Sequence, residues 1–137
     1  MKKWIWIPNI RLNDLYFDKP YNKYDEFVSD KQIVEYDDGL FDDDEVTYQY
    51  DNVGIFTFYQ HSKVFRGAEI KSNLYYNGQN LIGLTVKQLK KILSIDDLIL
   101  SKDGYYYSSK KLNASFWIDN NQVESVSIWI NHKILLL

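Results

Sequence analysis

The sequence of 137 residues contains no cysteine. This absence excludes disulfide bonds, thiolate nucleophiles and cysteine-based zinc sites, and it suits a reducing compartment such as the cytoplasm. The 2 histidines, His61 and His132, are too far apart in the chain to show the spacing of a metal site. Glycine-rich phosphate loops, His-Glu-x-x-His and Gly-x-Ser-x-Gly are also missing. We therefore expect a binding protein and not an enzyme, with no cofactor and no bound metal.

Long apolar runs are missing as well. The run at residues 4–7 ends at Pro8, and the run at residues 134–137 is equally short. Both are shorter than the apolar region of a signal peptide or a membrane-spanning helix. We expect a soluble, cytoplasmic and monomeric protein with no membrane partner.

Proline and glycine are scarce, at 2 and 6 residues, whereas aromatic residues make up 17% of the chain. The 12 tyrosines and 4 tryptophans favour strands, because aromatic rings fit the half-buried surface of a pleated sheet. The hydrophobic content of 45% and the length suit a single domain over residues 1–137. The expected fold class is α+β, with more strand than helix.

The clearest local signal is a short amphipathic helix that begins after Thr85. Thr85 and Gln88 have the spacing of a capping box, in which each side chain bonds the backbone amide of the other residue. Apolar residues then recur on one helical face, at Val86, Leu89, Ile92 and Leu93. Four strand-like segments follow, at residues 97–100, 104–107, 112–118 and 123–129. Together they form one helix followed by an antiparallel meander.

A weaker copy of this unit precedes it. Residues 9–14 align with residues 81–86, so that Asn13 takes the capping position of Thr85, and a helix-like or turn-like segment is expected after it. Residues 48–64 align with residues 107–123, and both segments have the sequence pattern of a strand, a turn and a second strand. We predict two tandem helix-plus-meander units, residues 1–72 and 73–137, that form a mostly antiparallel sheet with short helices on one face. The alternative is chance similarity between two aromatic-rich hairpins.

Charge is distributed unevenly along the chain. From Asp25 to Asp51 there are eleven acidic residues and one basic residue, Lys31, whereas the whole chain has a net charge of −3. Three interpretations remain open: a solvated acidic loop, a divalent metal site, or a docking surface for a basic partner. The metal site is disfavoured because residues 42–45 lack the alternating spacing of a calcium loop. Nucleic acid is disfavoured as a ligand because this segment would repel phosphates.

The helix-plus-meander unit resembles the repeat of the β-lactamase inhibitor protein and of the outer-membrane assembly lipoprotein of small-protein-A type. The stretch that carries this resemblance is Gly83-Leu84-Thr85-Val86-Lys87-Gln88-Leu89. In those families a glycine, a capping Ser or Thr and a short helix precede an antiparallel sheet. The resemblance covers residues 80–130 and, more weakly, residues 5–70. Because the lipid-bearing cysteine and signal peptide of the lipoprotein are missing, an envelope role is disfavoured.

Two other stretches resemble small bacterial proteins encoded beside polymorphic toxins, including immunity proteins of contact-dependent growth inhibition systems. They are Trp4-Ile5-Trp6-Ile7-Pro8-Asn9 and Tyr75-Tyr76-Asn77-Gly78-Gln79-Asn80-Leu81-Ile82-Gly83-Leu84. The resemblance implies a cytoplasmic antitoxin that binds the C-terminal toxin domain of a neighbouring cell's effector. Such domains are often nucleases, for example tRNA-cleaving RNases, and are commonly basic. The alternative is a non-enzymatic envelope-assembly or scaffold module of the same fold.

We expect this toxin inhibitor to act by occlusion, with carboxylates pairing with the toxin's basic residues and aromatics supplying contact area. Tyr36 and Phe41 lie inside the acidic run and are either loop anchors folded into the core or interface contacts. The predicted partner-binding residues are Glu35, Tyr36, Asp37, Asp38, Phe41, Asp42, Asp43, Asp44, Glu45, Tyr48 and Tyr50.

Overall fold

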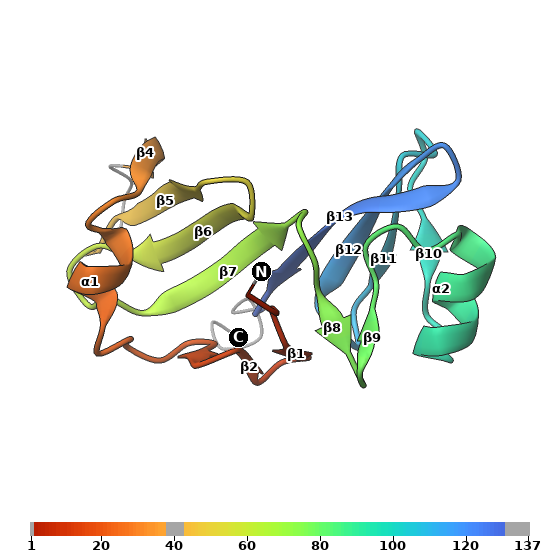
Figure 1. Ribbon diagram of the computed structural model, residues 1–137, viewed down its shortest axis with the longest axis horizontal. Coiled ribbons are helices and arrows are strands. Elements are labelled where there is room, and N and C mark those ends of the chain that lie inside the picture. The colour runs from red at the N-terminus through yellow and green to blue at the C-terminus, as the bar shows by residue number, and fades with distance from the viewer. Residues whose placement is uncertain (1, 38–42, 131–137) are drawn as a thin grey trace.

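An eight-stranded antiparallel sheet forms the centre of the molecule (Figure 1). The computed structural model describes residues 2–37 and 43–130. The strand order across the sheet is β10-β11-β12-β13-β7-β6-β5-β4. In chain order the strands are β4 (Gln32–Asp37), β5 (Glu45–Tyr50), β6 (Gly54–Tyr59), β7 (Phe65–Ile70), β10 (Ile99–Leu100), β11 (Tyr106–Ser109), β12 (Ala114–Asp119) and β13 (Gln122–Trp129). The predicted α+β class with a large antiparallel sheet is confirmed.

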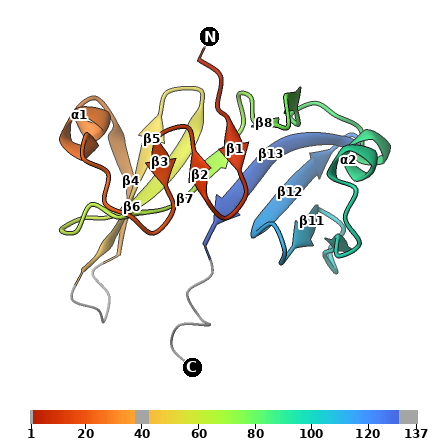
Figure 2. The same ribbon diagram turned by 90° about the horizontal axis from the view of Figure 1, so that it is seen from below.

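Short elements cover one face of this sheet, and Figure 2 shows both helices on the same side of it. They are α1 (Tyr24–Val28), α2 (Val86–Leu93), the small sheet of β1 (Trp6–Ile7), β2 (Arg11–Leu12) and β3 (Leu15–Tyr16), and the hairpin of β8 (Tyr75–Tyr76) and β9 (Gln79–Asn80). Among the helices in the described ranges, none is long and apolar enough to cross a membrane.

The core lies between the covered face and these short elements. Trp4 packs against Phe56 with ring centroids 5.2 Å apart, and Trp6 packs against Phe116 at 6.3 Å. Phe17 stacks on Phe65 at 5.1 Å. All of these rings are almost fully buried. Burial of each large aromatic side chain contributes roughly 2–3 kcal/mol, so the high aromatic content of the sequence is used mainly in this core.

Helix α2 begins where the sequence predicts it. The Gln88 amide donates to Thr85 Oγ1 at 3.2 Å, and the Thr85 amide donates to Gln88 Oε1 at 3.0 Å, which completes the capping box. Leu89 and Leu93 of the apolar face are buried. The helix ends at Ser94, whose left-handed backbone places its amide on the Lys90 carbonyl.

Of the helix-like or turn-like segment expected after Asn13, the structure shows the turn, and no helix starts there. Asn13 forms the turn between β2 and β3 with φ 53°, a left-handed conformation that asparagine tolerates well. Its side chain accepts from the Ile5 amide at 2.7 Å and donates to the Lys3 carbonyl at 3.1 Å. The side chain therefore secures a hairpin instead of capping a helix. Helix α1 starts later, at Tyr24, and its N-cap Lys23 makes no side-chain cap.

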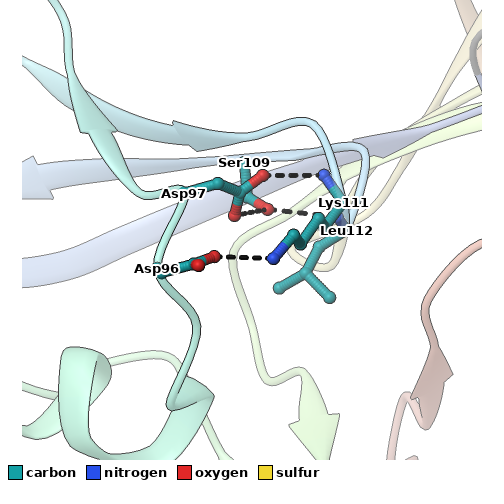
Figure 3. A network of polar contacts seen from close by, with 5 residues as sticks. All are labelled: Asp96, Asp97, Ser109, Lys111 and Leu112. Atoms are coloured by element: carbon teal, nitrogen blue, oxygen red, sulfur yellow. Dashed lines mark hydrogen bonds and ion pairs between the residues drawn. The ribbon is translucent and has the colours of Figure 1, made fainter.

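A carboxylate network fixes the turn between β11 and β12 (Figure 3). Asp97 accepts from the Ser109 hydroxyl at 2.8 Å and from the Lys111 amide at 2.9 Å. The Ser109 oxygen in turn accepts from the Leu112 amide at 3.1 Å. Next to it, the Lys111 ammonium donates to Asp96 at 2.6 Å. The network joins the segment after α2 to the sheet.

This network predicts acid-sensitive stability. The Lys111 amide, with help from the Ser109 hydroxyl, lowers the pKa of Asp97 below its usual value. Because the folded-state pKa is the lower one, the stabilisation is complete above the unfolded pKa of about 4 and is lost as the pH falls through the folded value. We expect Asp97→Asn to be less stable than the wild type at pH 7 and to lose less stability between pH 7 and about pH 3.

Urea unfolding at both pH values measures this effect. Asp119→Asn, an exposed carboxylate at the end of β12, is the matched control and should behave like the wild type. If Asp97→Asn and the wild type lose equal stability on acidification, the network does not carry the acid dependence.

Candidate functional site

The opposite face of the sheet carries no helix or hairpin within the described residues, and we call it the open face. It presents alternate residues of β5, β6, β7, β12 and β13, because successive side chains of a strand point to opposite faces. A hollow of about 400 Å³ lies across β5, β6, β7 and β13. Its lining includes Glu45, Thr57, Arg66, Glu69 and Trp129. A hollow of this volume has room for a small ligand or for a few side chains of a partner.

The hollow continues toward both ends of the sheet. On one side, Glu45 and Thr57 also line a second depression together with Glu35 and Thr47. On the other side, Glu69 also lines a third depression, together with Trp117 and Glu124 among others. The hollow shares lining residues with each of the other two depressions, so the three adjoin one another along the open face. Each depression has at least one carboxylate in its lining, and Arg66 and Lys71 also line the surface.

Hydrogen bonds between strands hold the open face rigid. Thr47 and Thr57 join their hydroxyls across β5 and β6 at 2.9 Å. The Trp117 indole donates to the Ser127 hydroxyl at 3.1 Å, and that hydroxyl donates to Glu69 at 3.5 Å. These contacts set the position of Glu69 before any partner arrives, which lowers the entropic cost of binding.

Arg66 balances part of the negative charge on this face. It lies 3.7 Å from Glu45 and 3.5 Å from Asp18, and its guanidinium lies over the Tyr59 ring at 4.8 Å. The Arg66 side chain is largely buried, with 13% exposed, whereas that of Glu45 is 41% exposed. Glu45 therefore keeps an accessible carboxylate beside the hollow.

The end of the sheet at β4 and β5 is acidic, and we call Glu35, Asp44 and Glu45 the acidic edge. Glu35 is exposed, and Asp44 is half-buried. The hydroxyl of Tyr36 donates to Asp44 at 2.9 Å, which orients that carboxylate. The Asp44 carbonyl accepts from the Gln60 amide at 2.8 Å, which ties the backbone of the acidic edge to the end of β6.

Asp43 has a structural role. Its two carboxylate oxygens accept from the His61 and Ser62 amides, each at 2.7 Å, at the turn between β6 and β7. Burial opposes ionisation, but these hydrogen bonds outweigh it and lower the pKa of Asp43. The Asp43 carboxylate therefore stabilises the turn between β6 and β7.

The remaining predicted residues fall into three groups. Asp38, Phe41 and Asp42 lie outside the described residues. Asp37 pairs with Glu45 in the backbone register of β4 and β5. Tyr48 and Tyr50 instead belong to the core face: Tyr48 is 7% exposed and shares a 2.8 Å hydrogen bond with Tyr24, and Tyr50 packs on Trp4 and Phe56. The Tyr48 ring is therefore not an accessible anchor, and the Tyr50 ring is half-buried on the same face.

The sequence reasoning missed the residues at the middle of the open face. Glu69, Trp117 and Trp129 come from three different strands and carry no local motif. Strand alternation gives a signal for them, since each is flanked by buried residues or lies two positions from another open-face residue. Within residues 2–37 and 43–130, no three His, Asp or Glu side chains are grouped so as to hold a metal ion.

Comparison of the chain with protein-family models, with curated proteins and with solved structures finds no match.

Proposed function

We propose that this protein is a cytoplasmic immunity protein that binds and neutralises a basic toxin domain of a contact-dependent inhibition effector, a nuclease such as a tRNA-cleaving RNase. One observation carries the proposal: Glu35 and Glu45 of the acidic edge line a depression of the open face, and Glu45 also lines the adjoining hollow. A nuclease presents lysines and arginines to its nucleic acid, and an acidic concave surface is complementary to them.

Occlusion is the proposed mechanism. Glu35, Asp44 and Glu45 pair with basic residues that the toxin uses for its substrate, while Trp117 and Trp129 contribute apolar contact area. Tryptophan in a well-packed interface is the residue type that most often dominates binding energy. The rigid sheet keeps these groups in position, and one copy of the protein blocks one toxin domain.

We also propose that residues 1–72 and 73–137 are tandem copies of one unit. Helix α1 precedes the meander of β4 to β7, and α2 precedes the meander of β10 to β13. Under the alignment of residues 48–64 with 107–123, β5 and β6 fall on β11 and β12. The two units would then meet where β7 pairs with β13 and share one open face.

The function is tested by identifying a large secreted protein encoded beside this chain and measuring the binding of its C-terminal domain. We expect one-to-one co-purification, nanomolar affinity, and a dissociation constant that rises by about tenfold or more between 50 mM and 500 mM salt, since exposed charges are screened by salt. Absence of binding would contradict the proposed function. Tight binding with a dissociation constant that does not change with salt would agree with the immunity role but contradict the acidic mechanism.

A further inference from the structure

Strand β4 forms one outer edge of the eight-stranded sheet. Its Cα register pairs it with β5, and it has no other neighbour in the strand order of the described residues. One row of its backbone amides and carbonyls therefore points away from the sheet. Such an edge is a template for an added strand, and proteins usually keep it short, charged or covered.

The side chains of β4 make this edge unusually apolar. Ile33 is 57% exposed, Val34 49% and Tyr36 50%. The opposite edge strand, β10, also exposes Ile99, at 63%, but it is only 2 residues long. A strand of 6 residues with three exposed large side chains is instead long enough to hold a partner strand.

A β-bulge sorts the residues of β4 onto two faces. The register shifts between Ile33 and Glu35, which makes Val34 the extra residue. As a result, Ile33 pairs with Tyr48 and Tyr36 with Val46, so both belong to the covered face and extend its core outward. Glu35 pairs with Thr47 and belongs to the open face, where it lines a depression with Glu45.

We propose that β4 receives an extended segment of the toxin domain as a ninth strand of the sheet. This inference rests on the proposed function, and it specifies the segment: apolar residues toward α1, beside Ile33 and Tyr36, alternating with Lys or Arg on the open face, beside Glu35. Backbone hydrogen bonds supply affinity in this mode of recognition, and the alternating side chains supply specificity.

Charge argues for the toxin as the occupant and against a second copy of this chain. Two β4 strands placed edge to edge about their centres would bring Glu35 of one copy close to Glu35 of the other. Like charges that face each other across paired strands are destabilising, whereas a cationic strand meets complementary charge.

Amide hydrogen exchange of the labelled protein, free and bound to the toxin domain named above, tests the inference. We expect exchange at outward-facing amides of β4 to slow by about tenfold or more on binding, while amides of β10 keep their rates. Ile33→Lys, which places a charge against the apolar residues of the added segment, should weaken binding by about tenfold or more, and the matched Ile99→Lys should not. Melting temperatures of the free variants show that both fold.

The outcomes separate this inference from the proposed function. If the toxin domain binds and the β4 amides exchange at their free rates, the added strand is wrong and the immunity role stands. If the toxin domain does not bind, both the added strand and the proposed function are wrong. If the free protein dimerises in sedimentation and its β4 amides are protected without toxin, the occupant is a second copy and the inference is overturned.

Discussion

Alanine at position 54 is expected to destabilise the protein by about 3 kcal/mol or more, a large part of the stability of a typical domain. Gly54 opens β6 with φ 154°, and a Cβ atom added there would lie 1.9 Å from the Glu69 carbonyl oxygen. The next closest atoms, Glu69 C at 3.0 Å and Ile70 Cα at 3.1 Å, also belong to the backbone. A flexible side chain would yield to such a contact, but here β7 itself must move.

The position of Gly54 in the sheet explains why this movement is costly. Gly54 pairs with Tyr50 on one side and with Ile70 on the other, so it is held between β5 and β7. Ile70 also pairs with Val126 of β13, the strand that joins the two halves of the sheet. A shift of β7 would thus disturb the centre of the core. The sequence hints at this requirement only through a lone glycine between strands.

Urea unfolding of Gly54→Ala measures the loss. Gly104→Ala is the matched control: Gly104 also has a positive φ, 80°, but nothing lies within 4 Å of the Cβ position. The control should lose only about 1–2 kcal/mol, the cost of left-handed backbone in a residue with a side chain. Equal losses in the two variants would show that the approach of Glu69 is not limiting.

Local signals explain which parts of this fold are predictable from the sequence. Helix α2 is predictable because Thr85 and Gln88 cap it through contacts three residues apart. The first half of the fold is harder to predict, because Asn13 can either cap a helix or form the turn of a hairpin. Its hydrogen bonds to residues 3 and 5 stabilise the hairpin. Strand alternation predicts β5, yet it does not tell which face is covered. For this reason the sequence predicts Tyr48 as a partner contact, whereas it lies in the core.

At the candidate site too, local sequence patterns predict only part of the structure, as the acidic segment shows. A run of like charges suggests one shared role, but the structure gives its members different contacts. Asp43 bonds the turn at His61 and Ser62, which no local pattern reveals. Glu69 and Trp117, which line the open face, reach it from distant parts of the chain. The sequence composition thus predicts the acidic end of the surface. The other residues of the open face can be identified only from the register of the strands.

Reversing charge on the acidic edge is expected to slow toxin association by about tenfold or more and to abolish protection. Glu35→Lys and Asp44→Lys together test this, because both carboxylates lie at the sheet end. Asp44 accepts from the Tyr36 hydroxyl, so Tyr36→Phe, which removes that hydrogen bond without a change of charge, is measured beside them. Asp43 is left unchanged, since its loss would disturb the turn between β6 and β7. Stopped-flow association with the toxin domain measures the rate.

The control separates a local surface from total charge. Glu26→Lys with Asp119→Lys changes the net charge by the same amount at two exposed positions, on α1 and at the end of β12. If long-range attraction by net charge alone drove association, both double variants would slow it equally. If the acidic edge contacts the toxin, only Glu35→Lys with Asp44→Lys also speeds dissociation, because like charges then face each other in the complex. The dissociation rate is therefore the measurement that assigns the contact to this end of the sheet.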